Sequence, residues 1–157
     1  MIVGIDPGLT GAIAVLNGTR IEHVSDMPTT SAGVASRAKA RMMDAYALAS
    51  ILRIHAMDAD RVVVERVSAH PGQGVSAMFS LGHSAGVIVG VCGALGLRVV
   101  YVPAQQWKRE FGLIGKEKVA SAAKAVELWG CCDLLRRKKD HGRADAMLIA
   151  AWGTVNQ

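Results

Sequence analysis

The sequence predicts an α/β fold with a five-stranded mixed sheet and helices on both faces. Two short segments rich in β-branched residues, at 2–5 and 61–65, have the pattern of buried strands, and each ends at an acidic residue. A helical pattern separates them, so a crossover connection can place the later strand parallel to the first. Strands at 11–16 and 21–26 extend the first one into an antiparallel meander, and residues 98–102 add a second parallel strand.

The amino-terminal strand ends at Asp6, directly before a turn at Pro7-Gly8. An ionised carboxylate at the end of a buried strand loses hydration and needs a cation or hydrogen-bond donors. One interpretation is that Asp6 accepts hydrogen bonds from the backbone of the turn. The other is that it binds a metal ion or handles a phosphate group.

Glu65 repeats this pattern at the end of the strand at 61–65. Taken alone, a glutamate at a strand end is commonly a surface residue. If the two strands are parallel neighbours, however, Asp6 and Glu65 lie side by side at one sheet edge. Two carboxylates that close repel each other unless a divalent cation lies between them.

The segments around the second acid are predicted to be a helix and two loops. Residues 27–36 form a loop rich in Pro, Thr, Ser and Gly, followed by a basic patch whose default interpretation is solvated surface; it contains Arg37, Lys39 and Arg41. Residues 44–55 are predicted to be a helix that begins near Asp44. Residues 69–75 form a loop directly after Glu65, a position that commonly carries substrate contacts.

A long apolar helix is expected at 76–95, within a stretch from 67 to 97 that has no charged residue. It is long enough to cross a bilayer, but its serines, histidine and glycines favour a buried helix of a soluble protein, and no membrane is expected as a partner. Gly82, Gly86 and Gly90 lie on one face. That smooth face either packs on the protein's own sheet or forms a homodimer contact.

The carboxyl-terminal third is predicted to be helical and basic. Helices are expected at 104–111, at 117–129 and from about residue 140 onward, and residues 104–143 contain ten Lys or Arg against five Asp or Glu. Such a distribution suggests one basic face for phosphate groups, although solvated surface is the plain alternative. In the last helix Asp145 lies on the inward flank, and His141 lies one turn earlier, which is a credible metal-ligand pair.

Composition limits the class of protein. The 157 residues fit a single domain, residues 1–157, and a net charge of +5 favours an anionic partner such as nucleic acid. Three cysteines without a CxxC spacing argue against a disulfide framework or a zinc site. We therefore expect a cytoplasmic protein without a secretory signal.

Three motifs in this order resemble RuvC-type Holliday junction resolvases: the Gly4-Ile5-Asp6-Pro7-Gly8 opening, the strand that ends at Glu65, and the helix containing Arg143-Ala144-Asp145-Ala146. The resemblance spans nearly the whole chain and suggests a compact, phage-type member. It implies a ribonuclease H-like fold, a homodimer, and Mg²⁺-dependent cutting of four-way DNA junctions by paired nicks. We expect the dimer to form through the helix at 76–95.

Carried over by position, the resemblance gives three acidic metal ligands, Asp6, Glu65 and Asp145. The family commonly places its fourth ligand three residues before the last acid, where this chain has Gly142. His141 is our preferred substitute, with Asp140 in reserve. The basic residues expected to contact DNA are Arg66, Lys108, Lys116, Lys118 and Arg143.

The family also places an aromatic residue soon after the second acid, where this chain has Ser68. Phe79 or His70 is therefore expected to take any base-wedging role.

The expected chemistry is phosphodiester hydrolysis with two Mg²⁺ ions per site, for which Mn²⁺ can substitute. Two other classes remain open. One is a nuclease of the same fold that acts on flaps or other branched DNA. The other is an ATP-binding protein of the actin and sugar-kinase type, which would need a second phosphate loop and a second domain that the sequence does not show.

Overall fold

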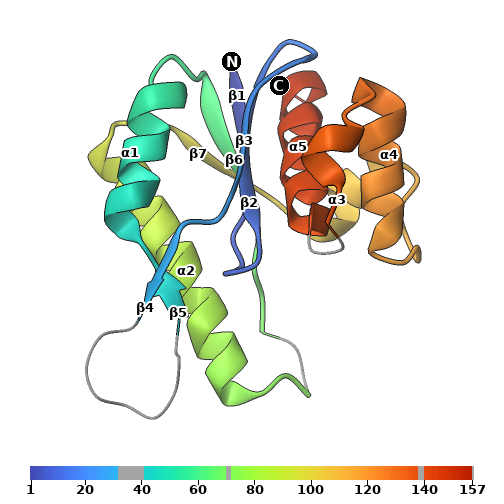
Figure 1. Cartoon of the computed structure of the whole chain (residues 1–157). Coiled ribbons are helices and arrows are strands. Elements are labelled where there is room, and N and C mark those ends of the chain that lie inside the picture. The colour runs from blue at the N-terminus through green and yellow to red at the C-terminus, as the bar shows by residue number, and fades with distance from the viewer. Residues whose placement is uncertain (32–40, 70–71, 138–139, 157) are drawn as a thin grey trace.

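The computed structural model of the chain describes residues 1–31, 41–69, 72–137 and 140–156 (Figure 1). The strands are β1 (Ile2–Asp6), β2 (Ala12–Asn17), β3 (Arg20–Asp26), β4 (Thr29–Ser31), β5 (Arg41–Met43), β6 (Arg61–Glu65) and β7 (Val99–Val102). The helices are α1 (Ala45–His55), α2 (Val75–Ala94), α3 (Ala104–Glu110), α4 (Val119–Trp129), the short 3₁₀ helix η1 (Cys132–Leu135) and α5 (His141–Val155).

The main sheet has the predicted topology. Its strand order is β3-β2-β1-β6-β7, in which β1, β2 and β3 pair antiparallel while β6 and β7 run parallel to β1. The register pairs Ile5 with Val64, so Asp6 and Glu65 follow at the same level on neighbouring strands. The predicted five-stranded mixed sheet is therefore confirmed, and its carboxyl edge carries both acids.

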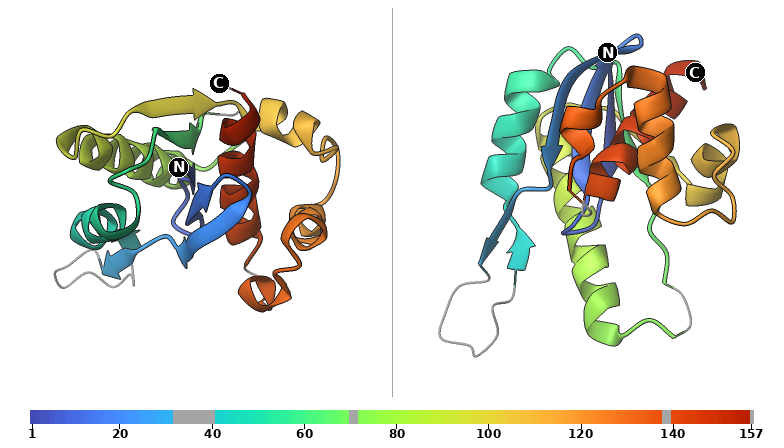
Figure 2. Two further views of the ribbon diagram at one scale, coloured as in Figure 1. Left: turned by 90° about the horizontal axis from the view of Figure 1, so that it is seen from above. Right: turned by 45° about the vertical axis from the view of Figure 1, so that its right-hand side comes forward.

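Helices cover both faces of this sheet, as expected (Figure 2). On one face α5 lies against the centre of the sheet, with α3 and α4 packed beside it. On the other face lie α1 and α2. The alternating side chains of the strands divide between two cores: Ala12, Ala14, Val63 and Val102 pack with α5, whereas Val3, Ile5, Ile13 and Val15 pack with α1 and α2.

Helix α5 approaches β1 closely because position 4 is glycine. A Cβ atom on Gly4 would lie 2.2 Å from the carbonyl oxygen of Ala146 and 2.4 Å from the nitrogen of Ala150. The small residues of α5 and Gly4 thus bring the helix backbone directly onto the strand. This contact holds Asp145, the neighbour of Ala146 in α5, over the central strand that ends at Asp6.

Helix α2 differs from the sequence prediction. It was expected to be buried, yet only 17% of its most apolar 18-residue window is buried. A Cβ atom on Gly82, Gly86 or Gly90 would meet nothing within 4 Å, so the glycine face does not pack on the protein's own sheet. By length and composition, α2 is the one helix among the described residues that could cross a membrane.

Two short strands were missed. Residues 29–31 and 41–43 pair antiparallel as β4 and β5, where a loop from 27 to 36 was predicted. The segment 29–31 is wholly polar, and the segment 41–43, Arg-Met-Met, is only three residues long, so neither has the alternating pattern from which strands are recognised. Arg41 lies on this ribbon, while Arg37 and Lys39 fall outside the described residues, as does His70.

Candidate active site

Asp6, Glu65 and Asp145 meet at the carboxyl edge of the sheet. Asp6 ends β1, Glu65 ends the adjacent strand β6, and Asp145 projects from α5, which packs across β1. The negative charges of Glu65 and Asp145 both act on Asp6, and Asp145 also acts on Glu65. The three acids predicted from the sequence are therefore brought together.

Burial and the two neighbouring carboxylates raise the pKa of Asp6 to about 7. Burial is the larger cause, and it is opposed by the backbone N–H of Gly8, whose nitrogen lies 3.4 Å from Oδ1 of Asp6, and by the charge of Lys118. The turn contact is therefore real but weak. It does not offset the cost of the buried charge, which leaves Asp6 in need of a cation.

Trp107 holds the carboxylate of Glu65. Its indole Nε1 donates a hydrogen bond of 2.8 Å to Oε2 of Glu65. Burial raises the pKa of Glu65, while this hydrogen bond and the charge of Lys108 oppose the rise. One oxygen of Glu65 is thus engaged by the protein.

Asp145 is the acid with an unsatisfied atom. Its Oδ1 is buried and has no hydrogen-bond partner among the described residues. Burial raises the pKa of Asp145, and the hydroxyl of Ser121 and the charges of Lys108, His141 and Lys118 oppose this. A buried carboxylate oxygen without a donor is costly, and a bound cation would remove that cost.

His141 and Asp140, the two candidates for a fourth metal ligand, have different partners in the structure. His141 is half-buried at the start of α5, and its charge acts on Asp145, so it belongs to the site. Asp140 is engaged elsewhere: its Oδ2 accepts from the backbone N–H of Arg137 at 2.7 Å, and its Oδ1 accepts from Nε of Arg137 at 2.8 Å. Asp140 therefore stabilises the start of α5, and its reserve role as a metal ligand has no support from the structure.

Gly142 cannot be replaced by an acid without a local shift. A Cβ atom there would lie 2.6 Å from the carbonyl oxygen of Thr10, in the loop that follows Asp6. The start of α5 thus packs directly on this loop. This close approach disfavours any side chain at position 142, a carboxylate included.

The predicted basic residues fall into three groups. Lys108 and Lys118 lie at the site, since their charges act on the acids. Lys116 and Arg66 are exposed on either side, and Arg66 lines a pocket of about 520 Å³ with Tyr101 and Gly86. Arg143 was expected to contact DNA, but its Nε donates to Oδ1 of Asp26 at 2.6 Å, and its guanidinium also donates to the carbonyl of Leu134.

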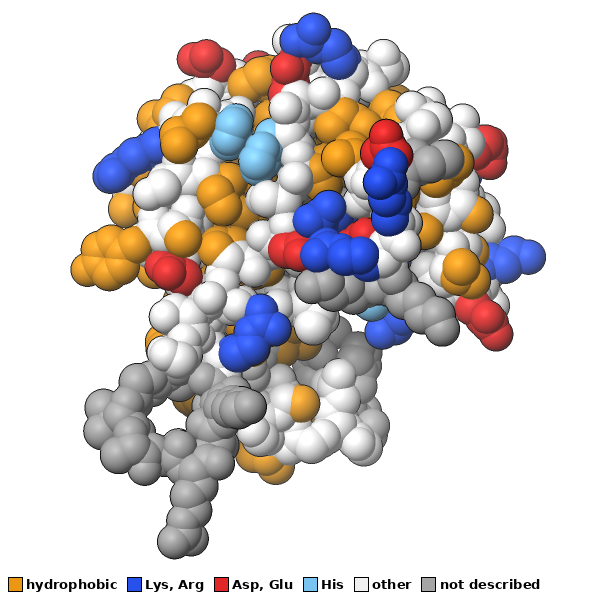
Figure 3. Space-filling model, viewed as in Figure 1, with side chains coloured by type: hydrophobic (Ala, Val, Ile, Leu, Met, Phe, Trp, Pro, Cys, Tyr) orange, Lys and Arg blue, Asp and Glu red, His pale blue; other side chains and the backbone are white. Residues whose placement is uncertain are grey.

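Arg143 is part of an ion cluster, which we define as Asp26, Arg137, Asp140 and Arg143. Arg137 donates to both oxygens of Asp26, at 3.0 and 2.9 Å, and to Asp140. Acidic and basic side chains meet in this way near the centre of the face shown in Figure 3. The cluster ties the end of β3 to the start of α5 and so helps to fix the helix that carries Asp145.

The donor set fits magnesium in an open site. Within the described ranges, no three His, Cys, Asp or Glu side chains form a group compact enough to hold one ion alone. Mg²⁺ does not require such a cage, because it commonly binds through one or two carboxylates and completes its shell with waters and substrate phosphates. Adjacent carboxylates with raised pKa values and a buried unpaired oxygen are suited to this mode.

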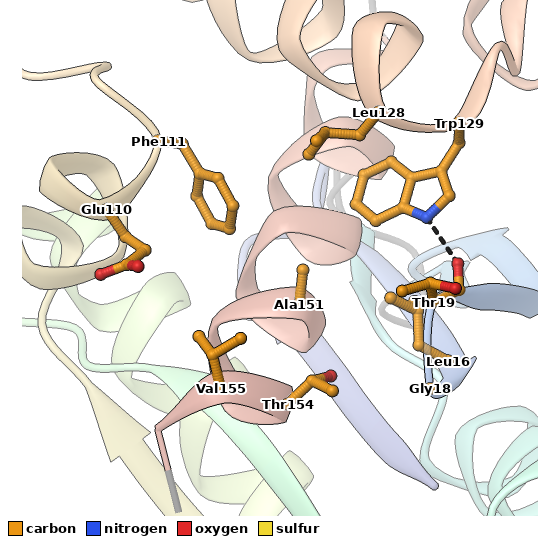
Figure 4. Close-up of a pocket in the computed structure, with 10 residues that line it drawn as sticks. All are labelled: Leu16, Gly18, Thr19, Glu110, Phe111, Leu128, Trp129, Ala151, Thr154 and Val155. Carbon is orange, nitrogen blue, oxygen red and sulfur yellow. Dashed lines mark hydrogen bonds between the residues drawn. The ribbon is translucent and has the colours of Figure 1, made fainter.

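A separate pocket, away from the three acids, is drawn in Figure 4. This pocket has a volume of about 240 Å³ and lies among α3, α4, α5 and the turn between β2 and β3. Because Leu16 pairs with Ile2, that turn lies at the amino end of β1, away from Asp6. The pocket is mainly apolar, with Glu110 as its only titratable side chain, so it lacks the groups for phosphate chemistry.

Comparison with known proteins agrees with this geometry. The structure superposes on Thermus thermophilus RuvC in complex with Holliday junction substrate with a TM-score of 0.67, over 96% of this chain and 89% of that chain, at 18% identity. A second structure of Thermus thermophilus RuvC gives a TM-score of 0.63 over 96% and 90% of the chains, at 19% identity. The chain has the RuvC fold. It is thus an α/β, ribonuclease H-like protein, as predicted.

Comparison of sequences also finds a Holliday junction resolvase among the proteins that this chain resembles. The chain is 45% identical over 84 residues, 52% of its length, to the chloroplastic Holliday junction resolvase MOC1 of Chlamydomonas reinhardtii. The matched part is 10% of that relative, so this chain corresponds to a small portion of it. No family model matches the chain.

Sequence reasoning missed two neighbours of the acids within the RuvC fold. Trp107 and Ser121 contact Glu65 and Asp145, yet they belong to other helices and lie 42 and 24 positions away in the chain. A tryptophan in a short basic helix is a weak signal by itself. It becomes informative only when the fold places α3 beside the end of β6.

Proposed function

We propose that this chain is a divalent-metal-dependent endodeoxyribonuclease that resolves four-way DNA junctions by paired nicks. One observation carries the proposal: carboxylates from β1, β6 and α5 gather at one sheet edge, and one of them, Asp145, has a buried oxygen without a donor. The RuvC fold and the match to a Holliday junction resolvase support the choice of substrate.

The proposed metal ligands are Asp6, Glu65, Asp145 and His141. The charges of Glu65 and Asp145 both act on Asp6, so Asp6 would help to hold both ions, Glu65 would hold one of them, and Asp145 and His141 would hold the other. When bound, two Mg²⁺ ions would supply an activated water and charge relief for the leaving oxygen. Mn²⁺ can substitute, since it accepts the same oxygen ligands.

The lysines at the site bind and orient the DNA. Lys108 and Lys118 lie close enough to the acids to act on their charges, so each ammonium group can contact a phosphate beside the scissile bond. Lys116 and Arg66 extend this cationic surface outward. Phe79, 75% exposed near the start of α2, is the aromatic residue best placed to stack on an unpaired base.

A homodimer through α2 matches the two-fold symmetry of a four-way junction. Only 17% of the most apolar 18-residue window of α2 is buried, and its glycine face is open. An exposed apolar surface of this kind is typical of an interface. For the location we propose a reducing cytoplasm, in the nucleoid or in the cytosol of a phage-infected host, with which the free thiol of Cys92 is compatible.

The test is cleavage of a panel of four-way junction, flap and duplex DNAs with Mg²⁺. We expect symmetric nicks in the junction that leave 5′-phosphates, with little cutting of the duplex. Preferential cutting of flaps would reassign the substrate within the same nuclease class, and nucleotide hydrolysis without DNA cutting would overturn the proposal.

Variants of the acids separate catalysis from binding. Asp6→Asn or Glu65→Gln is expected to abolish cutting while junction binding persists, because the fold and the lysines remain. The matched control is Asp58→Asn, an exposed acid in the turn before β6, at the opposite edge of the sheet. Equal loss of binding and cutting in Asp6→Asn, with Asp58→Asn unchanged, would show a structural role for Asp6.

A further inference from the structure

We propose that Trp107 is a positioning residue for the metal site, one whose indole N–H holds one oxygen of Glu65 and leaves the other directed to the metal. The inference rests on the proposed function, since it assigns Glu65 as a ligand. It goes beyond that function because it assigns a role to a residue that is neither a proposed metal ligand nor a proposed DNA contact.

The donor is held rigidly. Trp107 is fully buried and is among the largest side chains with no exposed surface, packed in the core with Leu113, Ala125 and Met147. Side chains in such a core occupy one rotamer at near-crystalline packing density. The Nε1 atom is therefore a fixed point, and the 2.8 Å hydrogen bond transmits that position to Oε2 of Glu65.

A glutamate needs this support more than an aspartate does. Its side chain has three rotatable bonds, and ordering them costs conformational entropy. A hydrogen bond from a fixed donor reduces the number of carboxylate orientations before the metal arrives, in the way that outer-shell partners orient metal ligands. With Oε2 engaged, Oε1 of Glu65 is the oxygen left for monodentate binding.

The face of the same ring carries a second group of the site. Nζ of Lys108 lies 5.2 Å from the centroid of the Trp107 ring, within the range of a cation–π contact. The edge of the indole thus orients an anion and its face a cation. Lys108 in turn acts on both Glu65 and Asp145. The ring of Trp107 therefore contacts Glu65 and Lys108 directly and affects Asp145 through Lys108.

A simpler account is that a buried indole N–H needs some acceptor. Trp129, a partly exposed indole, finds a main-chain acceptor instead: its Nε1 donates at 2.8 Å to the carbonyl of Thr19 (Figure 4). Trp107 instead uses a carboxylate of the candidate site. Trp129 is therefore the matched control for loss of an indole donor.

The experiment measures Mn²⁺ binding by the full chain without DNA, from the loss of the free-ion signal in electron paramagnetic resonance. We compare the unaltered protein, Trp107→Phe and Trp129→Phe. Phe keeps a ring face for Lys108 but removes the N–H together with part of the volume of the indole. To guard against poor folding of Trp107→Phe, a fourth protein carries 3-benzothienylalanine at position 107, which has nearly the shape of tryptophan but no N–H donor.

We expect the two proteins without a donor at position 107 to bind Mn²⁺ at least five-fold more weakly, with Trp129→Phe unchanged and junction affinity in EDTA equal in all four. The metal concentration for half-maximal cleavage should rise by the same factor. Unchanged Mn²⁺ affinity with 3-benzothienylalanine at position 107 would overturn the inference, as would no Mn²⁺ binding by the unaltered protein. Because this readout needs no DNA cutting, it is separate from failure of the proposed nuclease function.

Discussion

Asp6 shows how a buried carboxylate of the candidate site affects the stability of the metal-free protein. Burial and its acidic neighbours raise the pKa of Asp6 from 3.8 to about 7. Between these values the folded protein holds a proton that the unfolded chain releases. The contribution of Asp6 to stability is therefore present below pH 4 and is lost as the pH rises towards and through 7.

Replacing Asp6 should remove this pH dependence. In Asp6→Asn without metal, we expect a melting temperature at pH 7.5 above that of the unaltered protein by roughly 3 °C or more, and a smaller decline between pH 4 and 7. Added Mg²⁺ should stabilise the unaltered protein more than the variant. Thermal unfolding across this pH range, with Asp58→Asn as control, tests the expectation; a steeper decline in Asp6→Asn would contradict it.

Replacement of Lys118 and replacement of Arg143 should have different effects on DNA binding and on stability, although both are cationic residues near the acids. Lys118 is exposed and acts on Asp6 and Asp145, whereas Arg143 is held in the ion cluster by Asp26. Lys118→Ala should weaken junction binding and lower the salt slope by about one, with little change in stability. Arg143→Ala should cost roughly 1–3 kcal/mol of stability and leave the affinity of the folded protein nearly unchanged.

Binding titrations at several salt concentrations and chemical denaturation measure these two effects. If Arg143→Ala lowered the salt slope as Lys118→Ala does, while its stability stayed intact, the role of the ion cluster as a support for α5 would be wrong.

At the scale of elements, the contact between β1 and α5 determines whether the acids meet. A Cβ atom at position 4 would overlap the backbone of α5 at both Ala146 and Ala150. Gly4→Ala must therefore displace the helix that carries Asp145. We expect a loss of about 1–3 kcal/mol or more in stability and a larger proportional loss of cleavage.

The control for this change is Ser50→Ala in α1, at an exposed position away from the sheet contact. It should be neutral or stabilising by about 0.5 kcal/mol, because alanine favours a helix over serine. Chemical denaturation and cleavage rates compare the two. Full activity in Gly4→Ala would show that α5 can move without separating the acids.

Most elements could be predicted from the sequence because their patterns are local. The strand at Arg61–Glu65 has the predicted bounds, and Asp44 caps α1 by accepting from the backbone N–H groups of Tyr46 and Ala47. The pairing of Asp6 with Glu65 followed from the crossover rule. By contrast, β4 and β5 are held by pairing with each other, which a search for hydrophobic periodicity in single segments cannot detect.

Side-chain partnerships were harder to predict than elements. Asp140 and His141 are adjacent in sequence, yet Asp140 binds Arg137 while His141 acts on Asp145. That difference depends on where the ion cluster fixes the start of α5. The same holds for Trp107, whose partner Glu65 lies on another element.

At the scale of the whole molecule, the exposed face of α2 predicts a dimer in solution. Gly86→Glu would place a charge on that face, where the native glycine leaves open space. We expect this variant to be monomeric by analytical ultracentrifugation and to give unpaired nicks in a four-way junction. Ile54→Glu, at an exposed position of α1, should leave the dimer intact. If the unaltered protein were monomeric and still made paired nicks, the proposed dimer through α2 would be wrong.

The most direct test of the proposed metal site is anomalous diffraction from crystals of the unaltered protein soaked in Mn²⁺. The account predicts an ion within coordination distance of a carboxylate oxygen of Asp6 and of at least one oxygen from Glu65 or Asp145. Saturating Mn²⁺ that bound only elsewhere on the surface, or not at all, would contradict it.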